Sequence, residues 1–157
     1  MKAAAALLLA SITGDTRGAT ANANVQAGVI EPLVIDIIGV EYEWRLLYPG
    51  PDGRLNTGDD RTDMRHLHLP AHTDVRLQLH SEDYVYSFSL PHRDLKEIAV
   101  PDLEFALSFT TGKEGIFELL GDQMCGYAHP KLMGKLIIIS ADDFATRMRN
   151  LSHLPGG

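Results

Sequence analysis

Apolar residues alternate with polar residues, or gather in short β-branched and aromatic runs, along most of the chain after Leu33. Such runs, bounded by Gly, Pro and Asp, are typical of β-strands. We expect about eight strands, in the segments LVIDIIGV, EYEWRLLY, HLHL, DVRLQLH, YVYSFSL, LEFALSFT, GIFELL and KLIIIS. Many short strands at close spacing favour an all-β, antiparallel Greek-key β-sandwich.

Two segments depart from this pattern. Residues 49–63 read PGPDGRLNTGDDRTD, which is turn chemistry throughout and predicts an excursion within one domain. Near the end, Ser140 can cap a helix over ADDFATRMRN, with Asp143 at the capping-box position. We expect this short C-terminal helix to pack on the sandwich through a face made of Phe144, Met148 and Leu151.

The N-terminus resembles a secretory signal. Lys2 precedes the apolar run AAAALLLASI, and the small residues ATA end at Ala21. A run of about ten residues is short of the ~20 that cross a bilayer, which argues against an uncleaved anchor. We therefore expect residues 1–21 to be a signal peptide, and residues 30–151 to form a soluble periplasmic or extracytoplasmic domain without a transmembrane segment.

Composition narrows the function classes. The 157 residues are 45% hydrophobic and 22% charged, as in an ordinary globular domain, and the formal net charge is −7. No basic residues cluster as a nucleic-acid site requires, whereas an acidic surface attracts basic protein partners. We expect no nucleic-acid partner.

The segment GDQMCGYAHPKLMG, residues 121–134, contains the only cysteine of the chain. Cys125 is followed at steps of four by His129 and Met133. A thiolate, an imidazole and a weak thioether form the ligand set that selects copper for electron transfer. The segment lies between GIFELL and KLIIIS, so two neighbouring strands would hold these ligands rigidly.

Three separated stretches carry a resemblance to a known family. YEWRLLYPGPDGRLNTGDD, LHLPAHTDVRLQLHSEDYVYSFSLPHRDLKEIAVP and CGYAHPKLMGKLIII occur in the family's order. Residues 42–140 thereby resemble the soluble copper domain of cytochrome c oxidase subunit II, which has a cupredoxin fold. The resemblance implies an electron-transfer domain of a respiratory chain. Family members have two transmembrane helices before this domain, and their absence after the predicted signal favours a free periplasmic protein.

The ligand set departs from the family's. The binuclear CuA centre uses two cysteines, two histidines, a methionine and a glutamate carbonyl, and Cys125 and His129 match one residue of each pair. The first cysteine, glutamate, first histidine and methionine are replaced by Gly121, Gln123, Tyr86 and Leu132, and Met133 follows one residue late. Because two thiolates bridge the two coppers, a single cysteine excludes CuA.

Two interpretations follow from this partial set. In the first, Cys125 and His129 bind one copper ion, with Met133 or Met124 as a weak ligand and the Tyr86 phenol near the place of the missing imidazole. In the second, the site has decayed and the domain is a copper-free structural subunit, as in quinol oxidase subunit II. A copper carrier would use the same Cys and His in an exchangeable site. We expect the single-copper electron-transfer protein.

The resemblance also implies roles for surface residues. Trp44 and Tyr42 lie where the family's aromatic residues admit electrons, although a lone Trp is often a core ring. Glu82 and Asp83 lie where the family presents carboxylates to a basic c-type cytochrome, although loop solvation is an equal alternative. A membrane oxidase is the other expected partner.

Two other functions, a second metal site and a thiol hydrolase, have less support in the sequence. His66, His68 and His72 could together hold zinc or copper, but no cysteine or carboxylate stands at ligand spacing. A thiol hydrolase would use Cys125 as nucleophile and His129 as base. Such pairs usually come from distant segments, and no orienting Asn or Asp is evident.

Overall fold

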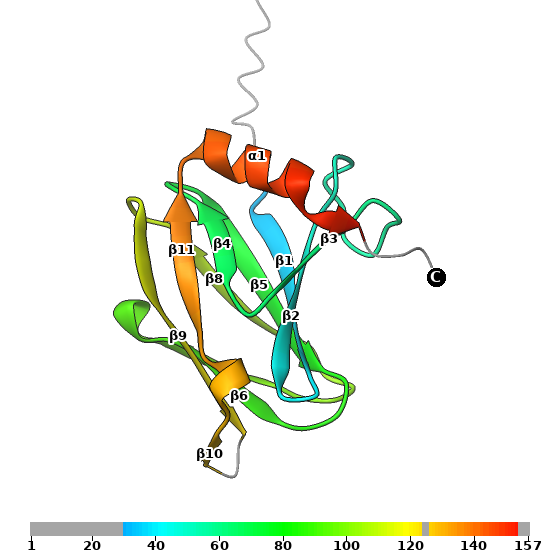
Figure 1. Ribbon diagram of the computed structural model, residues 1–157, viewed down its shortest axis with the longest axis vertical. Coiled ribbons are helices and arrows are strands. Elements are labelled where there is room, and N and C mark those ends of the chain that lie inside the picture. The colour runs from blue at the N-terminus through cyan, green and yellow to red at the C-terminus, as the bar shows by residue number, and fades with distance from the viewer. Residues whose placement is uncertain (1–29, 124–125, 154–157) are drawn as a thin grey trace, which may run out of the picture. The chain divides into compact units, whose positions relative to one another are not determined.

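The computed structural model describes residues 30–123 and 126–153, which fold into two β-sheets, one α-helix and two short 3-10 turns (Figure 1). The first sheet has the strand order β12-β3-β2-β1-β5-β8. Its strands are β1 (Leu33–Val40), β2 (Glu43–Tyr48), β3 (Arg61–Met64), β5 (Asp74–Ser81), β8 (Phe105–Thr110) and β12 (Ser152–His153).

The second sheet has the order β4-β11-β9-β6-β7, and β10 pairs with β9 beyond this path. Its strands are β4 (Leu67–Pro70), β6 (Tyr86–Leu90), β7 (Leu95–Ala99), β9 (Gly115–Gln123), β10 (Tyr127–Ala128) and β11 (Gly134–Ile139). The turns η1 (Pro91–Arg93) and η2 (Pro130–Leu132) follow β6 and β10.

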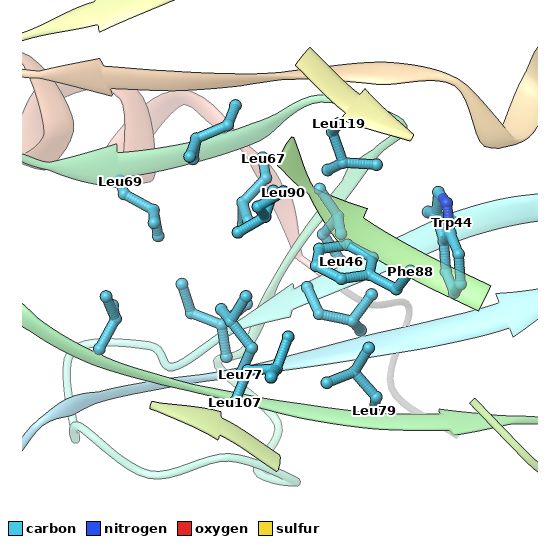
Figure 2. Close-up of a cluster of buried hydrophobic side chains, with 14 of the residues drawn as sticks. Trp44, Leu46, Leu67, Leu69, Leu77, Leu79, Phe88, Leu90, Leu107 and Leu119 are labelled. Carbon is cyan, nitrogen blue, oxygen red and sulfur yellow. The ribbon is translucent and has the colours of Figure 1, made fainter. Parts of the chain in front are cut away.

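Alternation of side chains along each strand builds one core between the sheets. In β5, Val75, Leu77 and Leu79 are buried, whereas Asp74 and Arg76 are exposed. Figure 2 shows the buried side chains filling the space between the sheets, with Trp44 beside Phe88. These two rings meet edge to face with centroids 5.4 Å apart. The core therefore has an aromatic part as well as an aliphatic one.

The all-β sandwich is confirmed, and each of the eight predicted segments contributes a strand. The pairing is not wholly antiparallel, because β1 pairs with β5 and β4 with β11 in parallel. The prediction of turns throughout residues 49–63 was wrong at the end of this segment, where Arg61–Met64 forms β3 between β2 and β12. Glu41 and Tyr42 were placed in a strand but form the turn between β1 and β2.

The predicted C-terminal helix is α1 (Ala141–Asn150). The Ser140 hydroxyl accepts a hydrogen bond from the backbone N–H of Asp143 at 3.1 Å, as expected of an N-cap. Phe144, Met148 and Leu151 pack against the core, which confirms the predicted apolar face. The helix lies at the end of the sandwich opposite β10 (Figure 1). Among the described residues, no helix is long and apolar enough to cross a bilayer.

Candidate functional site

The predicted ligand segment joins two neighbouring strands, as expected. β9 and β11 pair in antiparallel fashion, with Gly134 opposite Leu119. Between them the chain forms β10, which folds back on β9 so that Tyr127 pairs with Gln123. Cys125 and its neighbour Met124 lie outside the described residues.

Of the predicted pair Cys125 and His129, the structure describes His129. Its ring stacks on Tyr42, with centroids 4.8 Å apart and planes at 21°. Its Nδ1 atom is buried and has no hydrogen-bond partner in the described part of the chain. An unpaired buried nitrogen costs about 1–3 kcal/mol. A metal ion would give this atom a partner, so His129 fits the ligand role.

Tyr86 is completely buried, and its hydroxyl is committed to protein partners. The hydroxyl donates a hydrogen bond to Oδ1 of Asp83 at 2.7 Å and accepts one from the backbone N–H of Tyr42 at 3.2 Å. Burial, followed by the hydrogen bond to Asp83, raises the pKa of the Tyr86 phenol. A phenolate ligand would lose the hydrogen bond that the hydroxyl donates to Asp83 and would place a negative charge beside that carboxylate, so the geometry favours a structural role for this hydroxyl.

Gly121, which stands in the first cysteine position, faces a filled space. A Cβ atom added there would lie 2.7 Å from Nε1 of Trp44 and 2.8 Å from the carbonyl oxygen of Leu132. These two atoms are joined by a hydrogen bond of 3.0 Å. Trp44 is itself fully buried against Tyr86, with ring centroids 5.8 Å apart. The position that would supply the second bridging thiolate is closed by core packing.

Leu132 and Met133 differ sharply in burial, although they are neighbours in the chain. Leu132 is completely buried in the core, where the family has its methionine ligand. Met133 is 41% exposed. It lines a cavity of about 210 Å³ with Ser87 and Ser89, which alternate along β6 with the inward Tyr86 and Phe88. The structure does not bring Met133 towards Tyr86.

The predicted electron-entry residues differ in exposure. Trp44 is fully buried, so a redox partner cannot touch it directly. Tyr42 is half-buried and stacks on Tyr84, with centroids 5.2 Å apart. Tyr84 is 45% exposed and was missed in the sequence, although its place two residues before Tyr86 in a strand-like run could have indicated it. The aromatic surface of the site is therefore Tyr84 and Tyr42.

The two carboxylates predicted for docking are both engaged within the chain. Glu82 Oε1 accepts a hydrogen bond from Nη1 of Arg45 at 2.8 Å, on the surface. Asp83 accepts hydrogen bonds from the backbone N–H groups of Glu41 and Tyr84, in addition to Tyr86. Burial raises the pKa of Asp83, but these hydrogen bonds outweigh it and hold the pKa below its usual range. Asp83 is ionised and structurally bound at neutral pH.

The three histidines considered as a second metal site are separated. His68 is 8% exposed, with its Nδ1 3.4 Å from Oδ2 of Asp63. His66 instead accepts a hydrogen bond from the backbone N–H of Lys135. The backbone N–H of His72 bonds to the carbonyl of Gly112. Within residues 30–123 and 126–153, no three His, Cys, Asp or Glu side chains gather as metal ligands.

Sequence comparison supports the resemblance found in the three motifs. Residues 35–141 match the family model "Cytochrome C oxidase subunit II, periplasmic domain". Cytochrome c oxidase subunit 2 of Thermostichus vulcanus is 31% identical over 145 residues, which cover 92% of this chain and 41% of that protein. The alternative cytochrome c oxidase subunit 2 of Bradyrhizobium diazoefficiens is 28% identical, covering 70% of this chain and 48% of the relative. The chain thus spans less than half the length of these curated relatives.

A solved structure supports the fold. The crystal structure of the periplasmic domain of subunit II of cytochrome oxidase from Bradyrhizobium japonicum superposes with a TM-score of 0.64 at 19% identity, over 76% of this chain and 92% of that one. The cupredoxin-like fold is thereby confirmed. The periplasmic family model also confirms the expected extracytoplasmic location. The signal peptide at residues 1–21 and the domain limits 30–151 stay predictions.

Proposed function

Because the chain belongs to the family of cytochrome c oxidase subunit II periplasmic domains, we propose that it is a cupredoxin-type electron-transfer domain that binds one copper ion through Cys125 and His129. The proposal is supported by two observations together: there is no space for a cysteine side chain at position 121, and His129 has a nitrogen that is available to bind a metal ion. Gly121 cannot carry a second thiolate without moving Trp44, whereas Nδ1 of His129 is buried and unpartnered in the described part of the chain. One metal fits this arrangement better than two.

Bound copper would supply one-electron redox chemistry, and the chain's own residues would set its surroundings. Tyr42 restricts the His129 ring by stacking on it. β9 and β11 hold the two ends of the ligand segment in one sheet, which limits rearrangement between oxidation states. Neither of the other two predicted ligands is favoured, because the Tyr86 hydroxyl is engaged by Asp83 and Met133 lines a cavity with Ser87 and Ser89.

We also propose that a basic redox protein such as a c-type cytochrome, or a membrane oxidase, is the partner. The exposed Tyr84 stacks on Tyr42, and Tyr42 stacks on His129, so the three rings connect the surface to the proposed ligand. Glu82 and Asp83 directly precede Tyr84 in the chain, although Glu82 is paired with Arg45, and the chain carries a net charge of −7. Charge of this kind steers a basic partner.

Copper titration tests the single-copper site. Metal-free protein titrated with Cu(II) should develop a thiolate-to-copper band in the visible that saturates at one equivalent, with four hyperfine lines in its electron paramagnetic resonance spectrum. Cys125→Ser should abolish the band, and His129→Gln should weaken or shift it. His80→Gln is the matched control, because His80 lines a different cavity with Pro101 and Leu103. A seven-line spectrum would contradict the proposed stoichiometry.

A copper-free structural domain is the second candidate, and the committed Tyr86 hydroxyl favours it. Under this alternative, Tyr86 and Trp44 fill the space of the lost ligands and the domain acts through its surface alone. Wild-type protein would then stay colourless with Cu(II), as would Cys125→Ser. A colour that bleaches rapidly on addition of a competing chelator would instead indicate an exchangeable carrier site.

A further inference from the structure

The turn between β1 and β2 has an unfavourable backbone. Val40 pairs with Glu43, so the turn has only two residues, Glu41 and Tyr42. Both have positive φ angles, 50° and 62°. Two-residue turns of this kind strongly prefer Asn-Gly or Asp-Gly, because other side chains are strained in the left-handed region. The sequence Glu-Tyr therefore needs support from elsewhere in the fold.

Asp83 and Tyr86, from the segment leading into β6 and from β6 itself, give that support. Oδ2 of Asp83 accepts a hydrogen bond from the Glu41 N–H at 2.7 Å, and the Tyr86 hydroxyl accepts one from the Tyr42 N–H at 3.2 Å. The hydroxyl then donates to Oδ1 of Asp83 at 2.7 Å, which joins the two acceptors. Each amide of the strained turn thus has a side-chain acceptor.

The supported turn carries the ring that stacks on His129. Tyr42 is the second turn residue, and its ring lies 4.8 Å from the His129 ring and 6.3 Å from the Tyr86 ring. The Tyr86 ring is itself fixed, since it lies so close to Gly39 that an added Cβ would be 2.3 Å from it. The position of Tyr42 therefore depends on groups that cannot move independently.

We propose that Asp83 and Tyr86 are positioning residues that hold the β1–β2 turn so that Tyr42 orients the imidazole of His129. Tyr86 acts on the ligand through the turn and not as a ligand. The consequence for copper rests on the proposed function, whereas the orientation of His129 in metal-free protein does not. Both can be measured separately.

The test compares Tyr86→Phe with a matched core variant. Tyr86→Phe keeps the ring and removes only the hydroxyl, while Phe88→Leu weakens the neighbouring core without touching the turn. The His129 ring-proton shifts, assigned through His129→Gln and read by NMR in metal-free protein, report stacking on Tyr42. Tyr86→Phe should move them most of the way to their values in Tyr42→Leu. Phe88→Leu should leave them unchanged.

Two further measurements complete the test: the effect of a second substitution in the turn, and the affinity for copper. Glu41→Asn places a residue that tolerates positive φ in the first turn position, so it should restore part of the shift in the Tyr86→Phe background. Copper affinity should fall by about 10- to 100-fold in Tyr86→Phe, as for other groups that orient a ligand. Unchanged ring-proton shifts in Tyr86→Phe, or equal shifts in Phe88→Leu, would overturn the proposal. If the shifts move as expected but the wild type binds no copper, positioning stands and the proposed function fails.

Discussion

Restoring the family's first cysteine with Gly121→Cys should destabilise the domain and should not create a binuclear centre. The new Cβ would lie 2.7 Å from Nε1 of Trp44 and 2.8 Å from the Leu132 oxygen, which is far inside van der Waals contact. Overpacking a core costs about 1–3 kcal/mol, and loss of the Trp44–Leu132 hydrogen bond adds about 1 kcal/mol. We expect a total of roughly 2–4 kcal/mol, against the 5–15 kcal/mol typical of a whole domain.

Urea unfolding of metal-free, reduced protein measures this cost. Gly121→Ala should lose nearly as much stability as Gly121→Cys, because the Cβ atom makes the collision and the sulfur is not required. Gly58→Ala is the matched control, since an added Cβ there meets nothing within 4 Å. Its free energy of unfolding should stay within about 1 kcal/mol of the wild type.

Copper binding by Gly121→Cys, measured beside its unfolding, gives the result that would contradict this reasoning. If Gly121→Cys unfolds at the same urea concentration as the wild type and binds two coppers with a seven-line resonance spectrum, the space is not closed and the reasoning from Trp44 fails. A destabilised variant that binds at most one copper supports it.

Three further predictions concern the core and the helix. Trp44→Phe removes the donor to the Leu132 oxygen and should cost about 1–3 kcal/mol in urea unfolding, yet combined with Gly121→Cys the two losses should be less than additive because the smaller ring admits the new Cβ. Ser140→Ala should cost about 1 kcal/mol and lower the thermal midpoint, through loss of the N-cap of α1. Burial raises the pKa of Asp63, but hydrogen bonds from His68, Arg147 and the Met64 N–H outweigh it and lower the pKa below 3.8. The stability from Asp63 is therefore present above pH 3.8 and lost as pH falls through the lowered value, so wild type and Asp63→Asn should converge in urea unfolding on acidification.

The sandwich could be predicted because its signal is local. In strands such as β5, buried residues alternate with residues that are exposed or half-buried, and the same alternation is visible in the sequence. β3 was missed because Arg61–Met64 follows a run of turn residues and gains its order from pairing with β2 and β12. Its hydrogen-bond partners are distant in sequence, so no local pattern indicates them.

The candidate site was less predictable, for the same physical reason. Glu41 and Tyr42 have strand-like composition, but they form a left-handed turn whose two backbone N–H groups donate hydrogen bonds to Asp83 and Tyr86. Tyr86 was interpreted as a substitute ligand because it takes the place of a histidine. Its hydroxyl partners come from the preceding loop and from a turn 44 residues away, which sequence reasoning could not show.

The closed position and the unpartnered imidazole together favour a live single-metal site over a decayed one. Trp44 and Leu132 fill the space beside Gly121 and are joined by a hydrogen bond, so the absence of a cysteine at this position leaves no unpaired polar group there. His129 is different, because its buried Nδ1 finds no partner among the residues that the structure describes, and a buried nitrogen left unpaired lowers stability by about 1–3 kcal/mol. A chain under selection for structure alone would gain by replacing this imidazole with an apolar side chain that packs equally well on Tyr42. The presence of this imidazole four residues after Cys125 is therefore easier to explain if a metal ion gives it a partner.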